Sequence, residues 1–165
     1  RKARQVEQAG ADLLLICTNT MHKVADEIAG AIGIPVLHIA DATARAIRTA
    51  GIGTVGLLGT NFTMEQAFYR GRIEQHGIEV LVPPKNDRDA VHRVIYEELI
   101  LGQVRSESRD QYLAIIDAMH RRGAQAVIEG CTEIGLLVQQ EHTPVPLFDT
   151  TVIHAQQAVQ EALNG

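Results

Sequence analysis

Short apolar runs alternate along this chain with longer amphipathic stretches. This alternation is typical of an α/β protein in which helices flank mainly parallel sheets. Glycine follows several of the amphipathic stretches, where a helix commonly ends. The predicted strands are Leu13–Ile16, Val36–Ile39, Val55–Leu58, Glu79–Val82, Ala126–Ile128 and Leu147–Phe148. The predicted helices are Arg1–Ala9, His22–Ile32, Ala42–Thr49, Met64–His76, Asp89–Leu101, Ser106–Arg121 and Val152–Leu163.

An internal repeat says more about the domain organisation than the individual elements do. The first copy reads GADLLLICTNTMHKVADEI and then GIPVLHIADATARAI, and the second reads GAQAVIEGCTEIGLLV and then TPVPLFDTTVIHAQQAV. Each copy has a Gly-Ala step, an apolar strand, a Cys-Thr pair, an amphipathic helix, a Pro-led strand and another helix. Two long copies indicate a duplication rather than a solenoid. We therefore expect two pseudo-symmetric lobes that face each other across a cleft.

The repeat also suggests where the lobes divide. Residues 1–50 with 146–165 would form the first lobe, residues 51–145 would form the second, and the active site would lie between them. The second copy is preceded by GTVGLLGTNFTMEQAFYRGRI, which predicts a strand, a Gly-Thr turn and a helix. No such stretch precedes the first copy, so the first lobe is expected to lack its N-terminal strand and loop.

The two cysteines, Cys17 and Cys131, occupy equivalent places at the ends of predicted strands. Parallel α/β sheets bind ligands outside the carboxyl ends of their strands. The N–H groups at a helix start would lower a thiol pKa and attract a substrate carboxylate. A lone cysteine is more often a small buried apolar residue, but the repeated Cys-Thr pair favours catalysis. One thiolate would then remove an α-proton as base while the opposite thiol returns one as acid.

The net charge and the number of cysteines bear on which partners, location and metals to expect. A formal net charge of −5 gives no reason to expect nucleic-acid or membrane binding, and no apolar stretch approaches the length of a membrane span. With only two cysteines, a reducing, cytoplasmic location is expected rather than a secreted disulfide scaffold. The spacing of these cysteines matches no zinc or redox motif, so no metal is expected.

At these residues the sequence resembles the aspartate/glutamate racemase family, the cofactor-independent amino-acid racemases. The motifs that carry the resemblance are CTNT at 17–20, GCTE at 130–133 and LLGT at 57–60. The stretches CTNTMHKVAD, LLGTNFTMEQAFYRGR and EGCTEIGLLV are similar to the broad-specificity or acidic amino-acid racemases of bacteria. The resemblance implies a two-domain fold, a homodimer, a small amino-acid substrate and no pyridoxal phosphate or other cofactor.

The resemblance also implies roles for particular residues. Cys17 and Cys131 would be the catalytic pair, interconverting the L and D forms of aspartate or glutamate by two-base proton transfer. The family's members begin with a strand and a Gly-rich loop that contributes to the substrate site, and this sequence shows neither, which leaves open whether this stretch alone is active. The positions that would bind substrate are Thr18, Asn19, Thr20, Thr60, Thr132 and Glu133.

Other interpretations remain open at this point. The same scaffold could decarboxylate a malonate or isomerise maleate, and a non-catalytic carboxylate-binding or redox-sensing protein would also retain the thiols. Among the weaker candidates, His22 and Lys23 are expected to be solvent-facing side chains of a first helical turn. Asp41 and Asp149 are expected to cap helices.

Overall fold

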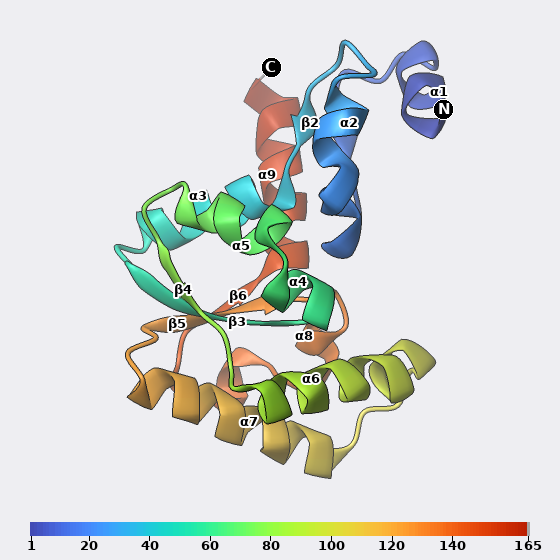
Figure 1. Cartoon of the computed structure of the whole chain (residues 1–165). Helices are drawn as coiled ribbons and strands as arrows, with labels where there is room; N and C mark the ends of the chain where they lie inside the picture. The colour runs from blue at the N-terminus through green and yellow to red at the C-terminus, as the bar shows by residue number, and fades with distance from the viewer. Residues whose placement is uncertain (165) are drawn as a thin grey trace.

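The computed structural model describes residues 1–164 and has the expected α/β architecture, with parallel sheets flanked by helices (Figure 1). One sheet has four strands in the order β4-β3-β5-β6, and a second sheet pairs β1 with β2. The strands are β1 (Leu14–Leu15), β2 (Val36–Leu37), β3 (Thr54–Gly59), β4 (Glu79–Leu81), β5 (Ala126–Gly130) and β6 (Leu147–Asp149). The α-helices are α1 (Lys2–Gln8), α2 (Ala25–Ala29), α3 (Ile39–Thr49), α4 (Asn61–Glu65), α5 (Ala67–Glu74), α6 (Lys85–Glu97), α7 (Ser106–Arg121), α8 (Ile134–Leu137) and α9 (Thr150–Asn164). Short 3-10 helices are η1 (Thr20–Val24), η2 (Leu99–Leu101) and η3 (Gln140–His142).

The core lies around the two central strands of the larger sheet. Every residue of β5 and nearly all of β3 are buried. Helices α6 and α7 cover one face of this sheet, while α3, α5 and α9 lie on the other (Figure 1). Because a parallel strand pair needs a long crossover connection, each strand is followed by helix before the chain returns to the sheet. Tyr112 and Ile116 of α7 and Met64 of α4 are among the fully buried side chains.

Glycines occupy the ends of both β3 and β5, where there is no room for side chains. Gly59 and Gly130 are register partners in the parallel pair. A Cβ atom on Gly59 would lie 2.9 Å from the carbonyl oxygen of Gly130, and one on Gly130 would lie 2.9 Å from the carbonyl oxygen of Leu58. Side chains would not fit here, so the residues that follow each strand, Thr60 and Cys131, emerge next to each other.

The segment that begins at residue 146 divides between the two sheets. Strand β6, which was expected in the first lobe, pairs with β5 and so belongs to the four-stranded sheet. Helix α9, which follows it, packs along α3 beside the two-stranded sheet (Figure 1). The crossover therefore occurs after Asp149 rather than before residue 146, because the Leu147–Asp149 backbone completes the ladder of β5. The division into two pseudo-symmetric lobes otherwise stays a prediction.

Some predicted helices are broken. The stretch Met64–His76 is not one helix, because Gln66 adopts an extended conformation (φ −89°, ψ 146°) between α4 and α5. The helix predicted from His22 to Ile32 is the 3-10 helix η1 followed by the short α2. The second cysteine is likewise followed only by the four-residue helix α8. Only short helical segments therefore follow the two cysteines, where the repeat predicted an amphipathic helix in each copy.

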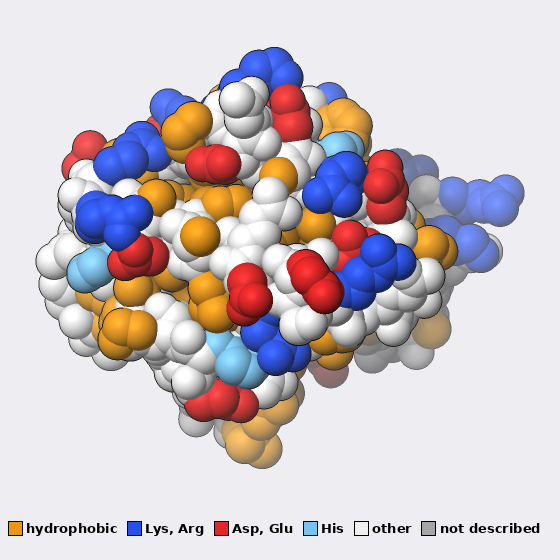
Figure 2. All heavy atoms as spheres, turned by 90° about the horizontal axis from the view of Figure 1, so that it is seen from below, with side chains coloured by type: hydrophobic (Ala, Val, Ile, Leu, Met, Phe, Trp, Pro, Cys, Tyr) orange, Lys and Arg blue, Asp and Glu red, His pale blue; other side chains and the backbone are white. Residues whose placement is uncertain are grey.

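Charged side chains of both signs are interspersed with apolar ones on the face drawn in Figure 2. This face therefore lacks the segregated positive surface that nucleic-acid binding uses. Within residues 1–164, no helix has the length and apolar character needed to cross a membrane.

Candidate active site

A cavity of about 200 Å³ opens where β3 and β5 end. Binding pockets for drug-sized molecules measure about 300–1,000 Å³, so this one suits a smaller molecule. Seven of the eight predicted site residues line it, and the exception is Cys17, which is exposed. The lining residues are Thr18, Asn19, Thr20, Thr60, Ile95, Tyr96, Gly130, Cys131, Thr132 and Glu133.

Cys131 is held as a thiol. Its Sγ donates a hydrogen bond to Glu133 Oε2 at 2.9 Å. Burial, with the hydrogen bond to the Glu133 carboxylate, raises the pKa of Cys131 to about 12. The backbone N–H groups of Glu133 and Thr132 act in the opposite direction but are outweighed. The expectation that a helix start lowers this thiol pKa was therefore wrong for Cys131, because burial and an adjacent anion dominate.

Glu133, the hydrogen-bond partner of this thiol, is ionised. Burial acts to raise the pKa of Glu133, but hydrogen bonds from Cys131 and Thr132 favour the carboxylate, and the net pKa lies below its ordinary value. The side chain is therefore an anion at neutral pH. An anion that accepts the S–H proton both orients the thiol and keeps it protonated.

The loop after β1 reaches the same cavity through two links. Asn19 is buried, and its Nδ2 donates to Thr150 Oγ1 at 3.0 Å, which in turn donates to the carbonyl oxygen of Glu129 at 2.9 Å. The hydroxyls of Thr20 and Thr60 lie 3.5 Å apart. Asn19 Oδ1, by contrast, is buried without a hydrogen-bond partner among the described residues. This amide oxygen is therefore a candidate acceptor for a ligand N–H group.

Thr60 owes its position to the turn from β3 into α4. Its side chain accepts a hydrogen bond from the backbone N–H of Thr63 at 3.4 Å, as an N-cap does. Its Oγ1 also lies 3.2 Å from the hydroxyl of Thr63. These contacts fix the hydroxyl of Thr60 on the cavity wall.

Three lining residues and one buried acid were not among the predicted site residues. Ile95 and Tyr96 reach the cavity from α6, and Gly130 is the last residue of β5. Glu129 lies within β5 and is buried, and burial with the nearby Asp149 carboxylate raises its pKa to about 8. The signal for Glu129 was present, since a carboxylate inside an apolar strand two residues before Cys131 needs an explanation.

Two weaker expectations also changed. His22 is only 3% exposed, so it is not a solvent-facing side chain. Asp149 Oδ1 accepts from the backbone N–H groups of Thr151 and Val152, which confirms its capping role. Asp41 does not cap α3, because the N-cap is His38. Asp41 instead accepts a hydrogen bond from Arg72.

A larger cavity, of about 590 Å³, lies beside the two-stranded sheet. Its walls include Leu13, Val36 and Leu37 with Arg45 and Glu161, and no cysteine or threonine. Among the described residues, no group of three or more His, Cys, Asp or Glu side chains is placed to hold a metal ion. The chemistry therefore gathers at the smaller cavity.

Fold and site together define an α/β protein with a thiol and several hydroxyl and amide groups around a small-molecule pocket at strand ends. The profile of the Asp/Glu/Hydantoin racemase family matches residues 1–158. The chain belongs to this family, whose members include racemases of amino acids.

Individual relatives agree with this assignment. The chain is 22% identical, over 98% of its length and 69% of the relative, to the broad specificity amino-acid racemase RacX of Bacillus subtilis. Its fold superposes with a TM-score of 0.93 on a protein of Yersinia pestis proposed to be an Asp/Glu racemase, at 56% identity over 98% of this chain and 70% of that one. An aspartate racemase homologue from Pyrococcus horikoshii gives a TM-score of 0.89 at 34% identity, over 97% of this chain and 70% of that one.

Proposed function

We propose that this chain carries the catalytic residues of a cofactor-independent amino-acid racemase that acts on aspartate or glutamate. The observation that carries the proposal is the Cys131–Glu133 pair facing a small cavity whose remaining polar walls come from Thr, Asn and backbone groups. This donor set matches an α-carboxylate, and the unpartnered Asn19 Oδ1 matches an α-ammonium group.

The proposed reaction removes the α-proton from one face of Cα and adds a proton to the other. Cys17, in its thiolate form, would accept the α-proton, and the Cys131 thiol would release its proton to the opposite face of the same carbon. The electron pair of the broken C–H bond is held on the substrate carboxylate until the new C–H bond forms. The hydroxyls of Thr20, Thr60 and Thr132 would stabilise that charge.

Glu133 would determine which of the two cysteines is protonated before substrate binds. Because Glu133 keeps Cys131 protonated, the resting site would hold an acid on one side. After one turnover Cys17 carries the proton and Cys131 is the thiolate, so the opposite enantiomer reacts through the reverse transfer. A substrate with a side-chain carboxylate would meet the same hydroxyl groups, whereas Tyr96 and Ile95 would form the less polar wall.

Exchange of the α-proton tests the proposal. The full chain is incubated in D2O with L-aspartate, L-glutamate and a panel of neutral amino acids, and loss of the α-proton signal is followed by NMR. We expect exchange with an acidic amino acid together with the appearance of its D form. Absence of exchange with every amino acid would refute the racemase. Turnover of maleate or of a malonate instead would assign the site to isomerisation or decarboxylation.

The proposal includes the homodimeric state and the cytoplasmic location that the resemblance and the sparse cysteines imply. Sedimentation velocity at several concentrations of the chain tests the first of these, with a single dimeric species as the expected result.

A further inference from the structure

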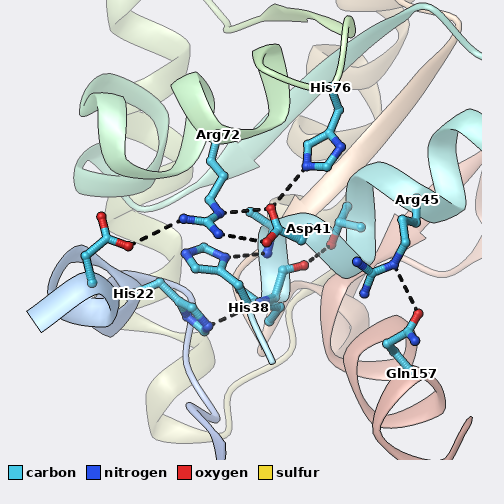
Figure 3. Close-up of polar contacts among 11 residues, drawn as sticks. His22, His38, Asp41, Arg45, Arg72, His76 and Gln157 are labelled. Atoms are coloured by element: carbon cyan, nitrogen blue, oxygen red, sulfur yellow. Dashed lines mark hydrogen bonds and ion pairs between the residues drawn. The ribbon is translucent and has the colours of Figure 1, made fainter. Parts of the chain in front are cut away.

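Three buried histidines lie next to one another, and two of them, His22 and His38, are drawn in Figure 3. His22 lies in η1, His38 at the start of α3 and His154 in α9. The ring centroids of His22 and His38 are 4.4 Å apart, and those of His22 and His154 are 5.9 Å apart. The proposed reaction uses none of these rings.

The hydrogen-bond partners of His22 define its protonation state. Its Nδ1 lies 2.8 Å from the carbonyl oxygen of Thr18, which can only accept a hydrogen bond. Its Nε2 lies 3.2 Å from the backbone nitrogen of Ile39, whose N–H can only donate. His22 therefore carries its proton on Nδ1 and a lone pair on Nε2, so one neutral imidazole ties the Thr18 loop to the first residue of α3. A second proton, on Nε2, would face the N–H of Ile39.

The neighbouring rings are constrained in the same way. His38 Nδ1 accepts from the N–H of Ala40 at 3.1 Å, so His38 is neutral as well. His154 Nε2 lies 2.7 Å from the carbonyl oxygen of Leu37 and therefore donates to it. Burial lowers the pKa of each of the three histidines, that of His38 to about 3.

The charged groups around the cluster come from α2, α3 and α5. Arg72 of α5 faces His22 and His38. It forms a bidentate ion pair with Asp41 of α3, with both hydrogen bonds at 2.8 Å. His76 lies 3.1 Å from Asp41, and Asp26 of α2 lies 3.5 Å from Arg72. A further polar link joins Arg45 of α3 to Gln157 of α9 at 3.4 Å (Figure 3). Because Asp41 is already engaged by Arg72 and His76, it does not offset a new positive charge on His22.

We propose that neutral His22 is a positioning residue for the racemase site, and that proton uptake by His22 releases the Thr18–Thr20 loop from its place on the cavity wall. The assignment of a catalytic consequence rests on the proposed function, but the loop movement itself does not. The Thr18 carbonyl that His22 binds belongs to a residue that lines the cavity, and Asn19 and Thr20 follow it.

Backbone NMR tests the loop movement without any substrate. The ¹⁵N-labelled chain is titrated from pH 7.5 downward while the imidazole nitrogens of His22 and the amides of Ile39 and Thr18–Thr20 are followed. We expect these amides to shift with the midpoint of His22, below pH 6.5, while amides of β5 stay in place. The proposal would be overturned if the chemical shifts of the loop amides did not change as His22 titrates, or changed only with global unfolding.

Kinetics of two variants test the catalytic consequence. His22→Asn retains an amide donor near the Nδ1 position and cannot take up a proton, whereas His22→Phe loses both contacts. For the unchanged chain we expect KM to rise by up to tenfold per pH unit below the His22 midpoint with kcat changing less, while His22→Asn shows no such rise. His22→Phe should have a raised KM at every pH. Identical KM profiles for all three proteins would overturn the assignment.

A control and a separate outcome keep the two proposals distinct. His120, exposed on α7 and bonded only to the carbonyl oxygen of Ala124 among the described residues, provides His120→Asn, which should leave the pH profile unchanged. If no amino acid exchanges its α-proton, the racemase proposal fails, and the NMR titration alone then decides whether His22 holds the loop.

Discussion

The two Cys-Thr segments of this chain look alike in sequence but differ in their surroundings. Cys17 follows a two-residue, half-buried strand and is exposed, whereas Cys131 follows a fully buried strand and is partly buried itself. Aligned on the cysteines, Leu15 stands where the second segment has Glu129, and Ile16 where it has Gly130. A repeated dipeptide therefore predicts a shared location at a strand end, while the residues on either side of it determine thiol chemistry.

Replacing either cysteine by serine should have the largest effect. If the two thiols act as base and acid, Cys17→Ser and Cys131→Ser should each lower racemisation by about 10²–10⁴-fold, the usual contribution of a positioned proton-transfer group. Racemisation is measured by polarimetry, and circular dichroism confirms that the variants fold. Full activity in either variant would break the proposed pairing of the two segments.

Thiol alkylation should separate the two cysteines directly. The pKa of Cys131 is raised to about 12, and only thiolates react, so Cys131 should be alkylated slowly. We expect Cys17 to react with iodoacetamide about 100-fold faster at pH 8, as measured by peptide mass spectrometry. Glu133→Gln removes the anion beside Cys131. It should therefore raise the alkylation rate of Cys131 and leave that of Cys17 unchanged. Equal rates in the unchanged chain would contradict the difference in environment.

Adding a methyl group at Gly130 should destabilise the fold. Its Cβ would lie 2.9 Å from the carbonyl oxygen of Leu58, so Gly130→Ala should lower the free energy of unfolding by about 1–3 kcal/mol. Gly53→Ala is the matched control, because its Cβ would only meet Gln125 Oε1 at 3.8 Å. Urea unfolding measures both variants. Equal stability of the two variants would show that the strand ends can separate without cost.

The expected effect at Glu129, where the first segment has Leu15, depends on pH. The pKa of Glu129 is raised from 4.5 to about 8, so between these pH values the folded chain keeps a proton that the unfolded chain has lost. The free energy of unfolding should therefore fall as pH rises through this range, by up to about 1.4 kcal/mol per pH unit.

Glu129→Gln should remove that slope and be more stable than the unchanged chain at pH 8, with the difference vanishing near pH 4.5. Urea titrations at matched pH values measure the difference, in which contributions from the histidines cancel. A constant difference at all pH values would mean that Glu129 is ionised in the folded chain.

Local patterns predicted most of the fold and much of the site. All six strands were placed within two residues at each end, and Ser106–Arg121 is the helix that its amphipathic pattern predicted. Thr60, Thr132 and Glu133 reach the cavity as expected, because the ends of adjacent parallel strands share one edge of a sheet.

The errors occurred where long-range packing decides. His22 was expected to face solvent because a charged residue in the first turn of a helix ordinarily does. It is instead covered by α9 and the start of α3, and neither is close in sequence. The break at Gln66 leaves no glycine or proline in the sequence to mark it. The sign of the pKa shift at Cys131 also depended on burial, which the strand-end position alone does not specify.

The route of the chain between its two sheets has a mechanical consequence. It passes from the α3 region into β3 after Thr49, and it returns from β6 into α9 after Asp149. Both crossings lie at the ends of elements, where hinge motions between lobes usually occur. If the two sheets belong to separate lobes, as the repeat predicts, opening of the cavity should turn about the line through Gly51 and Thr150.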